Sequence, residues 1–319
     1  PEYSGYPVQL NNVGRVENKG FEFTLNSRNL VGEFQWDMGF NLSMNRNKIL
    51  ELPENAHPKN WIPYSSGPGH MVGLGQTQLL QEGDPVGSFF GWIYDGVYQE
   101  GDDFVEGGGF EQEVGGEKFR DIDGVKDDEG NLTGEPDGRL NNDDRTIIGD
   151  PNPDFIWGLN NDFRWRGFDM NIFFQASQGN DIFNYTLMEL DLMAGRNNAT
   201  TAALDRWTPS NTDTDIPKAN GGRSRRASTR WIQDGSFLRL KNLAIGYSLP
   251  QTVVDKMGIR KFRIYVSAQN LWTLTDYEGY DPEVNYRTGG ATNSNQNLGL
   301  DYASYPNAKS YTLGLNIGF

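Results

Sequence analysis

Strict period-two alternation of apolar and polar residues is the feature that most constrains how this chain can fold. In the clearest run, residues 34–44, every second residue is apolar: Phe34, Trp36, Met38, Phe40, Leu42 and Met44. Alternation of this kind recurs along the chain, and helical periodicity is scarce. Period-two alternation predicts β-strands with one apolar face and one polar face, so the expected fold class is all-β and antiparallel.

We predict nine strands, near residues 14–28, 32–47, 71–82, 86–99, 153–165, 167–178, 236–249, 260–273 and 309–319. Many of them exceed the five or six residues common in globular strands. Their lengths match the roughly 9–11 residues that a tilted strand needs to cross a bilayer. The run at 71–82 is the weakest of the set.

The predicted connections alternate between short and long. The short ones are 29–31, 83–85, 166–167 and 250–259, and the long ones are 48–70, 100–152, 179–235 and 274–308. Short turns on one side and long loops on the other are typical of bacterial outer-membrane barrels. Such barrels have an even number of strands, so nine strands predict a segment of a larger barrel; a miscounted weak strand leaves a small self-contained barrel open.

Composition fits a barrel better than a helical membrane protein. Hydrophobic residues make up 36%, mean hydropathy is −0.65, and no apolar stretch of about 18 residues occurs, which excludes a membrane-spanning helix. A net charge of −15 without a basic stripe argues against nucleic acid as a partner. There is no cysteine, hence no disulfide. The chain starts at Pro1 without a signal peptide, so we expect a processed chain or a fragment.

The apolar faces fit two environments, a second sheet in a sandwich or lipid around a barrel. Aromatic residues near the ends of the apolar stripes favour lipid, because such rings prefer the headgroup level: Trp36, Trp157, Trp165, Tyr247, Trp272 and Tyr311. The last strand ends on Phe319, which is typical of the signal that barrels offer to the assembly machinery. We expect lipid contact for Phe34, Phe40, Ile264 and Leu315.

Several runs resemble the last third of SusC/RagA-like TonB-dependent transporters. They are Gly83–Gly91, Asp95-Gly96, Leu204–Pro209, Gly235–Leu243, Gly246–Pro250, Ser267–Trp272 and Gly279–Val284. The resemblance extends from about residue 13 to the end, and the runs occur in the family's order. It identifies residues 1–319 as the C-terminal part of a transmembrane β-barrel, with the plug domain and signal peptide absent.

The resemblance implies a 22-stranded barrel in the cell outer membrane that imports nutrients, often glycans or peptides. It also implies a SusD-like surface lipoprotein as a lid, energy from TonB through the missing N-terminal region, and lipid and lipopolysaccharide around the wall. The alternative from the residues alone is a secreted soluble β-sandwich that binds or adheres. Detergent dependence distinguishes the two.

One acidic constellation is a candidate calcium loop. Related transporters carry an uninterrupted run of alternating acidic residues here, similar to an EF-hand loop, which supplies oxygen ligands to calcium. Mapped onto this chain, the ligands would be Asp121, Asp123, Asp137, Asn141 and Asp144, with the carbonyl of Arg139. Residues 125–136 interrupt the pattern. The alternative is a solvated acidic loop, and bound calcium would order the loop.

No enzyme motif occurs, so we expect no catalytic residues and no required cofactor. His57 and His70 share one Pro/Gly-rich loop, where solvated histidines are the usual case. The basic cluster Arg223, Arg225, Arg226 and Arg230 is interpreted as a solvated loop. Four aromatics either stack on sugar rings, pack the loops or meet the lid, and no substrate residue is assigned: Trp61, Tyr64, Trp207 and Trp231.

Overall fold

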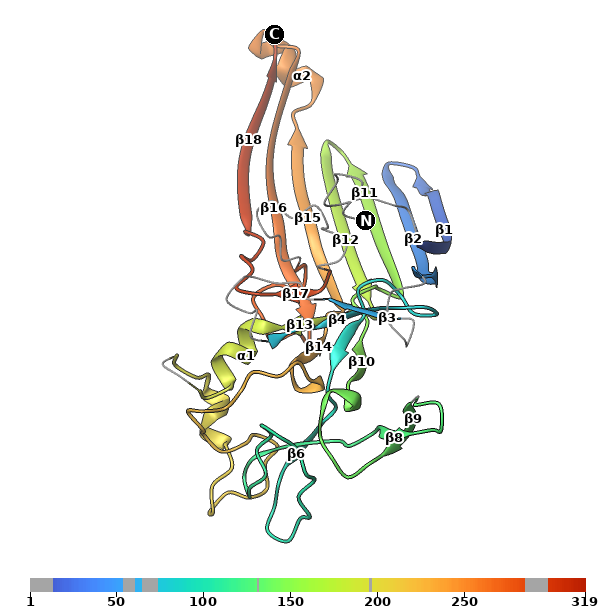
Figure 1. Ribbon diagram of the computed structural model, residues 1–319. Coiled ribbons are helices and arrows are strands. Elements are labelled where there is room, and N and C mark those ends of the chain that lie inside the picture. Colours follow the sequence, from blue (N-terminus) through green and yellow to red (C-terminus); the bar gives the residue numbers. More distant parts are fainter. Residues whose placement is uncertain (1–13, 54–60, 65–73, 131, 195–196, 285–297) are drawn as a thin grey trace, which may run out of the picture.

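One antiparallel sheet of seven strands dominates the computed structural model, which describes residues 14–53, 61–64, 74–130, 132–194, 197–284 and 298–319 (Figure 1). The strand order is β1-β2-β11-β12-β15-β16-β18. The bounds are β1 (Arg15–Val31), β2 (Phe34–Glu51), β11 (Phe155–Trp165), β12 (Phe168–Gln178), β15 (Phe237–Ser248), β16 (Lys261–Thr275) and β18 (Ser310–Gly318).

Shorter elements fill the connections. They are β3 (Trp61–Tyr64), β4 (Gln78–Gln81), β5 (Phe89–Gly91), β6 (Tyr94–Val97), β7 (Glu117–Phe119), β8 (Gly124–Lys126), β9 (Leu132–Pro136), η3 (Asn142–Asp144), β10 (Thr146–Gly149), β13 (Asp181–Asn184), α1 (Tyr185–Asp191), η4 (Thr201–Asp205), η5 (Thr229–Trp231), β14 (Ile232–Asp234), α2 (Gln251–Val254), η6 (Asp255–Met257) and β17 (Leu300–Asp301). Short strands pair as β10-β5-β4-β3, β14-β13-β17, β6-β7 and β8-β9. No helix in the described part is long and apolar enough to cross a membrane.

Seven of the nine predicted strands are confirmed, and two are wrong as strands of the large sheet. The segment predicted at 71–82 contains only β4 within its described residues, and the segment at 86–99 contains β5 and β6. Their apolar residues face a protein core: Leu79, Phe89, Phe90 and Val97 are buried. Alternation reports burial on one face and does not distinguish lipid from protein. The loops predicted at 48–70 and 100–152 are therefore parts of one long connection.

Short turns and long connections separate to opposite ends of the sheet. The β11–β12 turn consists of Arg166 and Gly167, whose φ angles are 46° and 88°. Positive φ at both central residues is the geometry that lets a two-residue hairpin match strand twist. The turn that holds α2 lies at the same end, and the three long connections gather at the other (Figure 1).

The long connections pack around cores of their own. The largest cluster joins Phe89, Phe183, Met188, Trp231 and Leu300, all of which are buried. These residues come from connections that are far apart in sequence. The loops therefore form a packed body at the loop end of the sheet, which fixes the position of any side chain that they present there.

Candidate functional site

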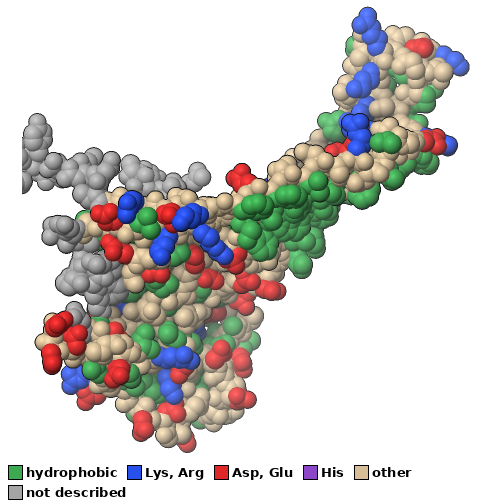
Figure 2. Space-filling model, turned by 90° about the vertical axis from the view of Figure 1, so that its right-hand side faces the viewer, with side chains coloured by type: hydrophobic (Ala, Val, Ile, Leu, Met, Phe, Trp, Pro, Cys, Tyr) green, Lys and Arg blue, Asp and Glu red, His purple; other side chains and the backbone are tan. Residues whose placement is uncertain are grey.

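The apolar face of the seven-stranded sheet is continuous across all the strands. One paired row crosses six of them: Phe34, Trp165, Phe168, Tyr247, Ile264 and Leu315. Exposed fractions are 44% for Phe34, 41% for Ile264 and 60% for Leu315, and Phe40 on the same face is half-buried. Figure 2 shows this face as a band of hydrophobic side chains along one side of the sheet.

No second layer covers this band within the described residues. An exposed apolar surface of this extent marks contact with another apolar phase or partner. A β-sandwich would bury the same side chains against its second sheet, so the geometry argues against the sandwich alternative. The aromatic residues predicted to form girdles lie close to strand ends, with Trp165 as the last residue of β11 and Tyr311 as the second of β18.

Asn161 is a polar exception on the apolar face, paired between Met38 and Ile172. Its Oδ1 accepts a hydrogen bond of 3.0 Å from the indole Nε1 of Trp36. The bond gives the indole N–H of Trp36 an acceptor and the Asn161 carbonyl a donor. This matters in hydrocarbon, where no water replaces a missing partner.

The opposite face is polar and hydrogen-bonded along its length. The amide of Asn171 donates to Asn160 Oδ1 at 2.7 Å and to Asp162 Oδ1 at 3.0 Å. Asn242 Nδ2 donates to Asn171 Oδ1 at 2.7 Å, which carries the network onto β15. Connected networks of this kind suit a wall that faces water and polar solutes.

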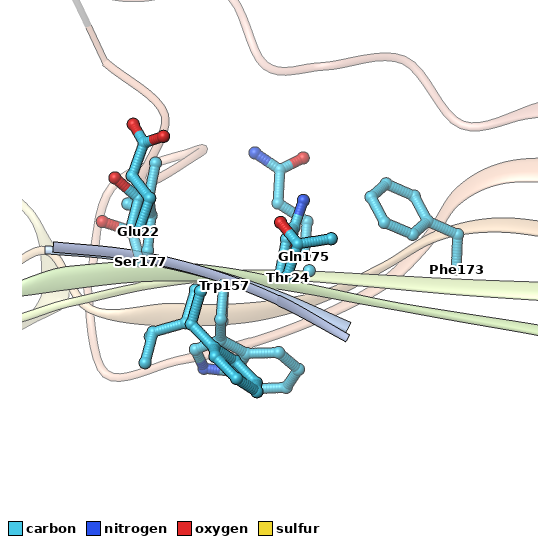
Figure 3. Close-up of a pocket in the computed structure, with 13 residues that line it drawn as sticks. Glu22, Thr24, Trp157, Phe173, Gln175 and Ser177 are labelled. Carbon is cyan, nitrogen blue, oxygen red and sulfur yellow. The ribbon is translucent and has the colours of Figure 1, made fainter. Parts of the chain in front are cut away.

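A hollow of about 450 Å³ lies on the wall where β1, β2, β11 and β12 meet (Figure 3). Glu22, Thr24, Gln175 and Ser177 rise with Phe173 on one side of the strands, and Trp157 lies on the other. Uncharged hydroxyl and amide groups beside an aromatic ring can both donate to and accept from a polar solute. Gly158 also lines the hollow, and Asn41 and Phe173 occupy the space that a side chain at this position would need.

Near the loop end of the polar face, the side chain of Arg239 is only 2% exposed. Its Nη2 donates to Asp281 Oδ1 at 2.6 Å and its Nη1 donates to Glu283. Burial acts to raise the pKa of Asp281, but the hydrogen bonds from Arg239 and from two backbone N–H groups hold it below its usual range. The sequence analysis did not predict this cluster. The one indication in the sequence was Arg239 itself, a cation within the predicted strand 236–249.

The five predicted calcium ligands come together in one turn-rich loop, and their oxygens accept backbone N–H bonds. Asp144 accepts from Ile122 at 3.0 Å and from Asn141 at 2.7 Å, and Asp121 accepts from Gly138 at 2.7 Å. Asp123 accepts from Gly134, Asp137 from Arg139, and Asn141 from Asp143. Burial raises the pKa of Asp144, and nearby Asp121 adds to the rise.

Among the described residues, no group of three or more His, Cys, Asp or Glu side chains is arranged to hold a metal ion. The loop thus has the predicted residues side by side, with their oxygens turned toward the backbone. Calcium binding stays a prediction.

The interpretation of the basic cluster as a solvated loop was wrong for three of its four arginines, because only Arg225 is exposed. The side chain of Arg223 is fully buried and its Nε donates to Glu111 Oε1 at 2.9 Å. Arg230 pairs with Glu117 at 2.9 Å, and burial raises the pKa of Glu117 despite both arginines. Guanidinium groups tolerate such burial because their fork satisfies two carboxylate oxygens at once. The cluster therefore ties loop segments together.

Two of the four candidate aromatics pack the loops. Trp231 is 2% exposed and belongs to the largest core cluster, and Trp207 Nε1 donates to Gln99 Oε1 at 3.2 Å. His57 and His70 lie outside the described residues, as do the side chains of Trp61 and Tyr64.

Comparison with known proteins places the chain in a family. No protein-family model matches it. It is 47% identical to TonB-dependent receptor P3 of Formosa agariphila over 100% of this chain and 30% of that protein, and 26% identical to SusC of Bacteroides thetaiotaomicron over 97% and 27%. The structure of the RagAB peptide transporter matches with a TM-score of 0.73 and 26% identity, over 100% of this chain and 31% of that one.

The chain spans about a third or less of the length of the relatives it matches. The matches confirm the predicted resemblance and the antiparallel barrel-type fold. The chain is a barrel segment of the TonB-dependent receptor family, related to SusC and to RagA-like transporters.

Proposed function

We propose that this chain forms part of the wall and the outer loops of an outer-membrane, TonB-dependent nutrient importer. The observation that carries the proposal is the two-sided sheet, with an uncovered apolar face across seven strands and a hydrogen-bonded polar face behind it. Lipid is the medium that suits the first face, and an aqueous lumen suits the second. The relatives are named as receptors and a transporter, which supports a role without catalysis.

The sheet offers two edges for barrel closure. Within the described residues, β1 pairs only with β2, and β18 pairs only with β16. We propose that further strands pair at these edges to close a barrel of 22 strands around a plug domain. TonB would act through a region outside this chain, and the strand that ends near Phe319 would be read by the barrel-assembly machinery.

Solute would pass along the polar face, with the hollow at β1, β2, β11 and β12 as a contact surface. The packed loop body supports docking of a SusD-like surface lipoprotein as a lid, because a fixed loop surface gives a lid a constant partner. Glycans and peptides are the candidate cargo. Figure 3 shows the wall groups available to them, including Gln175 and Ser177.

Fractionation of the full-length protein tests the membrane part of the proposal. We expect recovery in the outer-membrane fraction and extraction only by detergent. A stable monomer in plain buffer would contradict the proposal.

Uptake tests the transport part. Cells that lack the gene should lose uptake of the cognate oligomer, and cells that lack TonB should lose it equally. Uptake that persists in both strains would refute import by this protein.

A further inference from the structure

One loop segment is held against the polar face of the sheet by side-chain contacts. The segment is the strap, defined as residues 277–284. Tyr277 and Val284 at its two ends are buried with Ile182 in a small apolar cluster. The strap is therefore fixed to the loop body at both ends, and the residues between them lie over the wall.

The wall side of the attachment is one row of the polar face. Gln175 of β12, Arg239 of β15 and Thr273 of β16 are paired neighbours in this row. Arg239 Nε donates to Thr273 Oγ1 at 2.9 Å, which aims the two remaining guanidinium nitrogens at the strap. They reach Asp281 and Glu283. The guanidinium thus makes three directed bonds in a setting with almost no solvent.

Further donors, from the wall and from beyond the strap, converge on the same two carboxylates. Glu283 also accepts from Lys241 Nζ at 3.3 Å and from Asn307 Nδ2 at 3.0 Å. Asp281 accepts the backbone N–H of Glu283 at 2.9 Å and that of Asn307 at 3.0 Å. Removing the single guanidinium would leave two carboxylates partly buried without their main partner, which is costly. Arg239 is therefore the central group of the attachment.

The strap covers space beside the wall hollow. A cavity of about 280 Å³ is lined by Pro282, Glu283 and Val284 of the strap together with wall residues. Gln175 and Ser177 line both this cavity and the hollow of Figure 3. The strap thus overhangs one end of the hollow.

We propose that the strap narrows the passage beside β12 and β15 and that Arg239 is the latch that holds it there, so that the latch limits the size of solute that passes this wall. The latch itself follows from the contacts above. The size limit rests on the proposed import function. Arg239 is a positioning residue in this account, because it acts through the strap.

Hydrogen–deuterium exchange of the full-length protein in detergent tests the latch. In Arg239→Met, the backbone amides of Glu283 and Asn307 should exchange about 100-fold faster, since each lost charge-assisted hydrogen bond corresponds to tenfold or more. The matched control is Arg263→Met, which removes an arginine on the same face that pairs with Asp169, away from the strap. The control should leave strap exchange unchanged, and strap exchange within twofold of wild type in Arg239→Met would overturn the latch.

A second variant covers the case in which Arg239→Met fails to insert. Asp281→Asn with Glu283→Gln keeps the shapes and the arginine but removes both negative charges, and it should also accelerate strap exchange. Unchanged exchange in this variant would overturn the latch.

Uptake of an oligomer series by cells tests the size limit. Cells with Arg239→Met should import oligomers longer than the longest one that the wild type accepts, and cells with Arg263→Met should keep the wild-type cut-off. Faster strap exchange in Arg239→Met together with an unchanged oligomer cut-off would refute the size limit but would still support the latch. No uptake by the wild type would refute import, and the exchange result would still decide the latch.

Discussion

A charge placed on the apolar face should destabilise the protein only if that face meets lipid, and Val266 is the position to test. It is the sixth residue of β16 (Lys261–Thr275) and is 53% exposed. With a rise of about 3.4 Å per residue and a tilt of about 40°, it lies about 13 Å from the turn end. That depth is near the middle of an apolar band about 25 Å tall, so Val266→Arg should cost about 2–4 kcal/mol.

The matched control is its neighbour Ser267, whose side chain belongs to the polar face between Ala244 and Thr312. Ser267→Arg should change stability by no more than about 0.5 kcal/mol, as surface substitutions commonly do. Urea unfolding of the full-length protein in phospholipid vesicles, followed by tryptophan fluorescence, compares the two. Equal stability of both variants would refute lipid contact, because an arginine at a water-exposed Val266 would be harmless.

Three further predictions concern the wall and the loops. Trp36→Phe should cost about 1 kcal/mol alone and much less in an Asn161→Leu background, and equal costs in the two backgrounds by urea unfolding would refute the hydrogen bond as the cause. Arg223→Met should cost about 3–5 kcal/mol by removing the ion-pair partner of the largely buried carboxylate of Glu111, and an unchanged melting curve of the loop body would contradict this. Millimolar calcium should raise the melting temperature and Asp144→Asn should abolish that rise; titration calorimetry without binding heat in the wild type would remove the calcium proposal.

The sheet could be predicted from sequence because its pattern is local. Alternation across 34–44 and the pair Arg166-Gly167 each specify a strand or a turn from neighbouring residues alone. The prediction of two sheet strands within 71–99 was wrong, because apolar residues such as Leu79 and Phe89 are buried in the protein and do not face lipid. The medium beyond a strand face is set by tertiary structure, and a period-two pattern carries no information about it.

The polar contacts of the loops could not be predicted for a different reason. Arg239 and Asp281 are 42 residues apart, and Arg223 and Glu111 are 112 apart. A charged residue is visible in the sequence, but its partner is chosen by the fold. The sequence therefore does not distinguish a buried, paired arginine from a solvated one.

Site-directed spin labels at alternate positions of β16 and β18 test the central claim most directly. In vesicles that contain the full-length protein, labels at Ile264, Val266 and Leu315 should be accessible to oxygen dissolved in hydrocarbon and protected from a water-soluble nickel reagent. Labels at Ser267 and Thr312 should show the opposite preference. Labels at Ile264 and Leu315 that report water, or that are immobilised against another layer of the same molecule, would contradict the account.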